Sequence, residues 1–219
     1  RATIEFGPAQ SWFVVFRDEV SAPDAVPFPE FLPVQAIEGP WQLGFDPVWG
    51  TDEPQTFNDL VSWTESENPL IRFYSGTASY KTTFDLKKKP KGPVFLDLGR
   101  VEVMAHVFLN EKDLGITWKA PYRVEATDAI KSGKNNLEIR VVNTWVNRLI
   151  GDEHLPLDSE WKDFETMLRW PDWFISGEQR PSGRYTFTSA RHYNKDSNLQ
   201  TSGLLGPVML NAIKCNDNE

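Results

Sequence analysis

The 219-residue sequence has one cysteine, three histidines and no long apolar run. A single cysteine, Cys215, excludes an intramolecular disulfide, and no Cys/His cluster has the spacing of a zinc site. No stretch approaches the roughly 18 apolar residues of a membrane-spanning helix, so we expect no membrane partner. The formal net charge of −8, from 23 basic and 31 acidic residues, argues against a nucleic-acid partner, because such binding depends on basic surfaces.

The signatures of several enzyme classes are also missing. We find no G-x-S-x-G motif, no phosphate-binding loop and no H-E-x-x-H motif. A glycosidase holds two carboxylates at a defined separation, and nothing in the spacing of the acidic residues at 152–165 fixes two of them across a cleft. No βα repeat predicts a catalytic barrel. We therefore assign no catalytic residue, no metal ligand and no cofactor, while a structural calcium held by loop oxygens would leave no spacing pattern.

Short alternating patterns are what the sequence does contain. Residues 94–98 and 136–142 alternate apolar with other side chains, which is the period of a strand with one buried face. Between them, the polar turn Asn110-Glu111-Lys112 separates two short β patterns and predicts a hairpin. Several short strands at this spacing predict an all-β fold, an antiparallel β-sandwich.

Outside this region the patterns predict two more strands and a helix, and they divide the chain into an N-terminal segment and a main domain. Residues 11–16 form a compact apolar run typical of a buried strand, and the prolines at 21–40 indicate an extended connector. We assign residues 1–36 to a strand and Pro-rich connector from a preceding domain, packed on the sandwich, and residues 37–219 to the main domain. An insertion over 151–181 is predicted to hold a helix at 157–170, capped by Asp158, and residues 182–190 are predicted to return to strand. Because the chain begins without methionine, we expect a piece of a larger protein or a mature product.

Several segments carry a resemblance to a known family. Residues 95–99, 107–115 and 120–124, with the strand ending in Asn143, resemble the sugar-binding, galactose-binding-like jelly-roll domain of glycoside hydrolase family 2. Residues 145–153 (WVNRLIGDE) and 180–197 resemble, more narrowly, the C-terminal sandwich of large bacterial proteins similar to glycoside hydrolase family 106, the α-L-rhamnosidase-type enzymes. The resemblance implies a catalytic domain in the same polypeptide as partner, with the catalytic carboxylates in that separate barrel. It also implies a periplasmic or extracellular location.

Nine tryptophans are an unusual supply for a domain of this size. An exposed tryptophan face suits the C–H face of a sugar ring, whereas a buried one fills the core. We favour burial for Trp12, Trp41 and Trp63, and we leave both interpretations open for Trp118 and Trp145. Packing of the insertion onto the sheet is the expected role of the tryptophans at 161, 170 and 173.

Loops at the ends of strands are where a rigid sandwich presents binding residues. Two such loops combine aromatic, charged and amide side chains. They give a hypothetical carbohydrate site of Trp118, Tyr122, Arg123, Trp145, Asn147, Arg148, Asp152, Glu153 and His154. For the polar set at 147–154 we favour the alternative, an internal Arg–Asp pair that fixes the loop.

Four functions stay open at this point. The leading hypothesis is a non-catalytic domain of a glycoside hydrolase, which supports the catalytic domain and contacts carbohydrate. The alternatives are an autonomous carbohydrate-binding module, an enzyme in its own right and a purely structural spacer between domains, because a fold does not establish a function.

Overall fold

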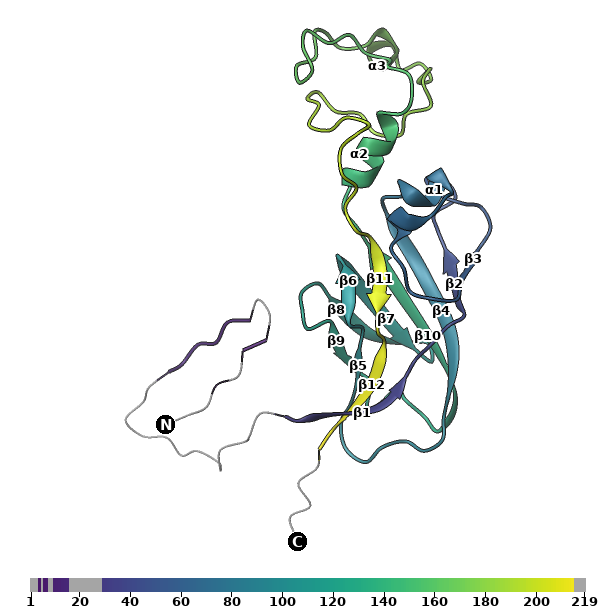
Figure 1. The fold of residues 1–219 in the computed structure, drawn as a ribbon, viewed down its shortest axis with the longest axis vertical. Coiled ribbons are helices and arrows are strands. Elements are labelled where there is room, and N and C mark those ends of the chain that lie inside the picture. The colour runs from purple at the N-terminus through teal and green to yellow at the C-terminus, as the bar shows by residue number, and fades with distance from the viewer. Residues whose placement is uncertain (1–3, 5, 8–9, 16–28, 215–219) are drawn as a thin grey trace.

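The computed structural model describes residues 4, 6–7, 10–15 and 29–214, and in this part of the chain two antiparallel sheets pack face to face (Figure 1). One sheet has the strand order β1-β12-β5-β9, the other β3-β2-β4-β10-β7-β8, and a short β11-β6 pair lies beside them. The all-β antiparallel sandwich is therefore confirmed. The strands are β1 (Phe31–Ala36), β2 (Trp41–Gly44), β3 (Gln55–Phe57), β4 (Thr77–Leu86), β5 (Val94–Asp97), β6 (Arg100–Glu102), β7 (Met104–Leu109), β8 (Lys112–Thr117), β9 (Arg123–Glu125), β10 (Gly133–Val142), β11 (Gly203–Gly206) and β12 (Met209–Ile213).

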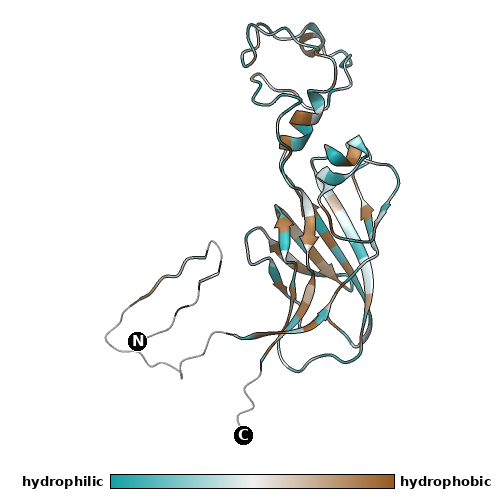
Figure 2. Ribbon diagram, viewed as in Figure 1, coloured by the Kyte–Doolittle hydropathy of each residue, from teal (hydrophilic) through white to brown (hydrophobic). Residues whose placement is uncertain are grey.

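Strand β10 lies in the middle of the larger sheet, between β4 and β7. Its side chains Leu137, Ile139 and Val141 are buried, as the alternation predicts. Ile139 stands opposite Tyr80 on one side and Val107 on the other, so the three rows form one continuous apolar face. Figure 2 shows this concentration of apolar residues along the strands of the sandwich.

The core also contains a buried polar contact between the sheets and the loops. Trp63, in the short 3-10 helix η1 (Trp63–Glu65), donates its indole N–H to the Tyr80 hydroxyl at 2.6 Å. The same hydroxyl accepts the backbone N–H of Leu204 at 3.0 Å. Burial is confirmed for Trp41 and Trp63 and is wrong for Trp12, whose residue surface is 47% exposed.

The predicted hairpin is the β7–β8 connection. Asn110 and Glu111 both have positive φ, at 51° and 69°, the conformation of a two-residue turn whose twist suits a hairpin. The Asn110 amide also donates to the Ala129 carbonyl at 2.9 Å and to Asn135 at 2.8 Å. The hairpin prediction is confirmed. The Asn110 side chain also fastens the turn to a loop about twenty residues away in the sequence, a tertiary contact that the turn pattern does not predict.

The N-terminal predictions meet a different outcome. Residues 11–15 are exposed and do not form a strand, so the buried strand predicted there is wrong over these residues; Phe16, the connector residues up to 28, and Cys215 lie outside the described residues. Within the described part of the chain, no strand of either sheet is paired with residues 11–15. The end of the connector forms β1, which pairs with β12 at the edge of its sheet, where Pro33 is tolerated.

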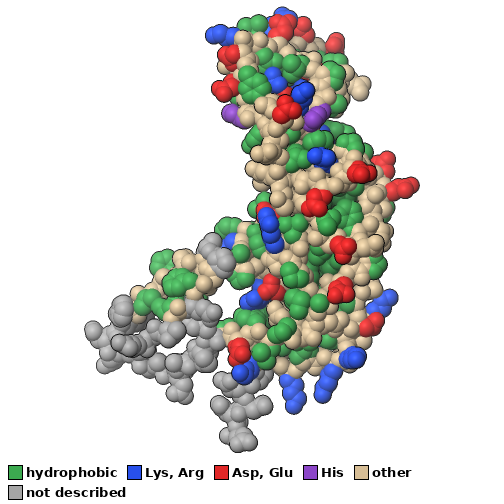
Figure 3. All heavy atoms as spheres, viewed as in Figure 1, with side chains coloured by type: hydrophobic (Ala, Val, Ile, Leu, Met, Phe, Trp, Pro, Cys, Tyr) green, Lys and Arg blue, Asp and Glu red, His purple; other side chains and the backbone are tan. Residues whose placement is uncertain are grey.

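Residues 146–199 form a lobe that stands beyond the end of the sandwich, and we call it the insertion lobe (Figures 1 and 3). It contains α2 (Val146–Asp152) and α3 (Asp172–Ser176) but mostly irregular chain. The other helix is α1 (Pro69–Arg72), at the end of the sandwich. Among the described residues, no helix has the length and apolar character needed to cross a membrane.

Two predictions within the insertion lobe are wrong. Residues 157–170 are not helical, because the Asp158 carboxylate accepts hydrogen bonds from Arg180 and Ser182 instead of capping a helix. Asp163 likewise accepts two nearby backbone N–H groups in a turn, a local alternative to helix. Residues 182–190 are not a strand, because backbone N–H groups at 185 and 186 donate to the Asp152 carboxylate rather than to a neighbouring strand.

Candidate functional site

Helix α2 follows β10 at the start of the insertion lobe and carries three of the predicted site residues, and three more lie next to its two ends. The sequence analysis treated residues 145–154 as a loop; the structure shows a helix over Val146–Asp152 that begins after Trp145. Its buried residues are Asn147, Arg148, Ile150, Gly151 and Asp152, so most of its polar groups face inward. Helix α2 therefore connects the sandwich to the rest of the insertion lobe, and the exposed Trp145 lies at its start.

Asn147 fixes the strand that returns from the insertion lobe to the sandwich. Its amide donates to the Gln200 carbonyl at 2.7 Å and to the Ser202 hydroxyl at 2.8 Å. Its side-chain oxygen accepts the backbone N–H of Gln200 at 2.8 Å. Both polar atoms of the Asn147 side chain are hydrogen-bonded to residues 200 and 202, so this side chain has a structural role.

Arg148 and Asp152 form the internal pair that the sequence analysis favoured. The guanidinium Nε lies 3.2 Å from the Asp152 carboxylate, and the two side chains are only 5% and 2% exposed. The other Asp152 oxygen accepts both the backbone N–H and the hydroxyl of Thr186 at 2.6 Å. Burial lowers the pKa of Arg148, and the nearby Asp152 carboxylate opposes that shift. The pair therefore fastens the insertion lobe to α2.

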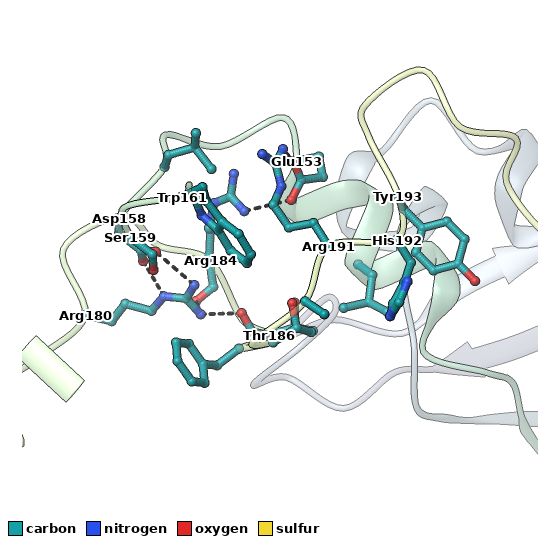
Figure 4. A pocket seen from close by; sticks show the side chains of 15 residues that line it. Glu153, Asp158, Ser159, Trp161, Arg180, Arg184, Thr186, Arg191, His192 and Tyr193 are labelled. Atoms are coloured by element: carbon teal, nitrogen blue, oxygen red, sulfur yellow. Dashed lines mark hydrogen bonds and ion pairs between the residues drawn. The ribbon is translucent and has the colours of Figure 1, made fainter. Parts of the chain in front are cut away.

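Further buried ion pairs continue this connection through the insertion lobe (Figure 4). Glu153 pairs with Arg184 at 3.0 Å and also with Arg191. Asp158 pairs with Arg180 at 2.5 Å, and Arg180 in turn donates to the carbonyls at 184 and 186. The lobe is thus held by guanidinium groups that bridge carboxylates and backbone carbonyls, in place of a sheet or a long helix.

Trp145 lies on an exposed aromatic surface that only the folded chain assembles. Its residue surface is 53% exposed, and its ring meets that of Trp49 edge-on at a centroid distance of 6.0 Å. Tyr185 contacts the other side of Trp49 at 5.6 Å. We call Trp49, Trp145 and Tyr185 the aromatic surface. Sequence reasoning missed Trp49 and Tyr185, because no local spacing links positions so far apart.

The remaining predicted residues lie elsewhere. Trp118 follows β8 and is 67% exposed, Tyr122 is partly buried against the core, and both lie on the sandwich body rather than beside α2 (Figure 1). Arg123 pairs with Asp97 at 2.5 Å and covers a phenylalanine ring, so its charge is already matched. His154 lies at the end of α2 with its ring 5.1 Å from Phe73.

The tryptophans of the insertion do not pack on the sheet, which corrects that prediction. Trp170 and Trp173 form a cluster with Phe174 and Phe187 inside the insertion lobe, with centroid distances of 4.7–5.9 Å between contacting rings. The lobe thus has its own aromatic cluster, in which Trp170 and Phe174 stay about half exposed, and it stands away from the sandwich (Figure 3). Among the described residues no group of three or more His, Cys, Asp or Glu side chains is placed to hold a metal ion.

Comparison with known proteins identifies the sandwich. The family model for the glycosyl hydrolase 2 galactose-binding domain-like domain matches residues 55–178, more than half of the chain. The chain belongs to this family. The matched residues include β4, β10 and α2, which connect the core to the aromatic surface.

Relatives place this galactose-binding-like domain among glycoside hydrolases. A putative beta-glucuronidase of Formosa agariphila is 44% identical over 180 residues, covering 81% of this chain and 15% of that protein. A rhamnosidase from Novosphingobium sp. PP1Y has 33% sequence identity and a TM-score of 0.67, covering 89% of this chain and 16% of that chain. The galactose-binding-like domain thus spans less than a fifth of the length of either relative.

A more distant structure shows the fold alone. A β-glucuronidase from Ruminococcus gnavus, at 16% identity and a TM-score of 0.50, covers 88% of this chain and 30% of that chain. The family match ends at residue 178, within the insertion lobe, yet β11 and β12 beyond it complete the sheets. The galactose-binding-like domain therefore needs the returning strand that Asn147 holds.

Proposed function

We propose that this domain is a non-catalytic part of a glycoside hydrolase of the family 106, α-L-rhamnosidase type, in which it supports the catalytic domain and contacts carbohydrate. The observation that supports it is the aromatic surface, three contacting rings around the start of α2, of which Trp145 is 53% exposed and Tyr185 37% exposed. An exposed aromatic face with few directed polar groups suits a sugar ring. The resemblance to secreted enzymes supports a periplasmic or extracellular location.

The test compares two exposed tryptophans. Trp145→Ala should remove glycan binding, measured on a glycan array, because it deletes the most exposed of the three rings, whereas Trp118→Ala on the sandwich body should leave binding unchanged. Both variants should keep nearly the wild-type melting temperature, since truncation of a half-exposed ring costs far less than the about 3–5 kcal/mol of a buried one. Equal glycan binding by the wild type and Trp145→Ala would show that this surface does not bind carbohydrate.

The chain itself should not hydrolyse aryl rhamnosides or galactosides. Its carboxylates at 152, 153 and 158 are held by arginines in the interior of the lobe, so none is presented as a free acid or base pair. Turnover by the purified chain that disappears in Asp152→Asn or Glu153→Gln would instead support an enzyme in its own right. The catalytic domain of the same polypeptide is the partner that the proposal requires.

A second candidate function, an autonomous carbohydrate-binding module, is favoured by a groove on the outer face of the larger sheet. The groove has a volume of about 750 Å³ and is lined by Gln42, Lys81, Phe108, Glu138 and Arg140, among others. Arg140 already lies over the Phe108 ring and pairs with Glu138 at 2.7 Å, so two polar groups of the groove are partly occupied by each other. Loss of array binding in Phe108→Ala but not in Trp145→Ala would assign the glycan to this groove.

A further inference from the structure

The buried charges of the insertion lobe and α2 do not balance. The ion pairs described above join four guanidinium groups to three carboxylates, and no side chain among them is more than 17% exposed. One positive charge is left over. The groups are Arg148, Arg180, Arg184 and Arg191 against Asp152, Glu153 and Asp158. Charges removed from water are normally paired, so the imbalance calls for one further negative group.

The unmatched positive charge lies at Glu153, because this one carboxylate pairs with both Arg184 and Arg191. At this point the Arg191 Nε is buried and has no hydrogen-bond partner in the protein, and the same is true of the indole nitrogen of Trp161. Both atoms are donors, and the Arg191 guanidinium lies 5.5 Å from the Trp161 ring centre. A buried donor without an acceptor is costly, so both donors indicate an acceptor between or beside them.

A cavity lies against these residues. It has a volume of about 40 Å³, and its walls include Trp161, Arg180, Arg184 and Arg191, the apolar Leu149 and Phe187, and the carboxylates Glu153 and Asp158, both already paired with arginines (Figure 4). A water molecule needs only about 10–15 Å³ on this measure. The cavity therefore has room for a group the size of a carboxylate and leaves the rest of a larger ligand outside.

We propose that this cavity binds the carboxylate group of a ligand, with an acidic saccharide as the class it takes. One carboxylate supplies the missing negative charge and two acceptor oxygens for the donors of Arg191 and Trp161. Water would satisfy the donors and leave the charge unmatched. The aromatic surface is a different set of residues, so this site stands independently of the function proposed above.

The experiment follows the indole proton of Trp161 by NMR in the whole chain, assigned by its loss in Trp161→Phe. Glucuronate, acetate and glucose are added in turn at constant ionic strength. We expect a saturable shift of this signal with both carboxylates and none with neutral glucose. Tighter binding of glucuronate than of acetate supports an acidic saccharide, whereas equal binding of the two overturns the assignment to a saccharide. No saturable shift with either carboxylate overturns the proposal.

Variants separate the site from general charge effects. Arg191→Gln should weaken glucuronate binding by about tenfold or more, measured by calorimetric titration, because it removes a charged donor. Arg169→Gln is the matched control, since Arg169 lies in the same lobe but is 59% exposed and pairs with Glu160. If Arg191→Gln disturbs the fold, Trp161→Phe keeps an aromatic side chain and removes the indole N–H, and it should also weaken binding. Unchanged affinity in Trp161→Phe, or an equal loss in Arg169→Gln, would contradict the proposal.

Discussion

The Arg180 guanidinium lies 2.5 Å from the carboxylate of Asp158, joining two residues 22 positions apart in the insertion lobe. Ser182 donates to the same carboxylate oxygen at 2.5 Å, and Arg180 also reaches the Thr186 carbonyl. These contacts replace the helix that local spacing predicts, because the Asp158 side chain is no longer available as a cap. The order of the lobe therefore depends on whether this carboxyl is ionised.

We expect the insertion lobe to loosen in acid. Burial raises the pKa of Asp158, but the hydrogen bonds from Arg180 and Ser182 and the Arg180 charge together lower it below its usual value. A lowered pKa in the folded state means that this contribution to stability is full above the unfolded pKa of about 3.9 and is lost as the pH falls through the folded value. The protection factors of the amides at 157–190, which correct for the intrinsic exchange rate at each pH, should fall on acidification in that range. Asp158→Asn should show raised exchange already at neutral pH, and a pH profile identical to that of the wild type would contradict the assignment.

Asn147→Ala should destabilise the sandwich through the strand it holds. The substitution removes one hydrogen bond to the buried Ser202 hydroxyl and two to the backbone of Gln200, and such a bond contributes about 0.5–1.5 kcal/mol. Urea unfolding measures the loss. Asn136→Ala, at an exposed position of β10, is the control and should change the free energy of unfolding little. Equal effects of the two substitutions would show that the Asn147 amide is not needed.

Gly151→Ala should also be destabilising, although alanine is the better helix former by about 1 kcal/mol. A Cβ at residue 151 would lie 2.6 Å from the Phe73 Cβ and 2.4 Å from an Arg148 guanidinium nitrogen. Either α2 moves off Phe73 or the Arg148–Asp152 pair shifts, so the melting temperature should fall. Gly44→Ala, whose nearest atom is 3.7 Å away, is the control. A melting temperature at or above that of the wild type would mean that α2 adapts freely.

Tyr80→Phe tests the buried contact between the sheet and η1. It removes the only oxygen that accepts both the Trp63 indole and the Leu204 backbone N–H in the structure, so we expect a loss of about 2 kcal/mol or more in urea unfolding. Burial raises the pKa of the Tyr80 hydroxyl, so it stays protonated through the alkaline range where an exposed tyrosine ionises. Tyr193→Phe, in the insertion lobe, should have little effect on the unfolding of the core. A Tyr80→Phe protein as stable as the wild type would contradict this account.

The candidate site was only partly predictable from the sequence. The sequence indicated Trp145 and the polar residues after it, but the structure separates them: Trp145 faces solvent, whereas Asn147 and Asp152 are buried. Which side of α2 faces inward depends on Phe73 and on the residues at 185–202, which are distant in sequence. The partners of Trp145 on the aromatic surface, Trp49 and Tyr185, come from two other segments and leave no local pattern.

The sequence by itself determined strands β5 and β10 of the sandwich and the β7–β8 hairpin. A strand buried on one face must alternate, and a two-residue turn needs residues that tolerate positive φ, so both properties are written in neighbouring residues. Only the tertiary structure decided the insertion lobe, because its polar side chains choose distant partners over local ones. Asp158 bonds Arg180 rather than its own backbone, and Asp152 takes the N–H groups that a strand at 182–190 would need. A charge-assisted hydrogen bond in a buried setting outweighs a helix cap or an unpaired strand, and no local pattern records which distant residue supplies it.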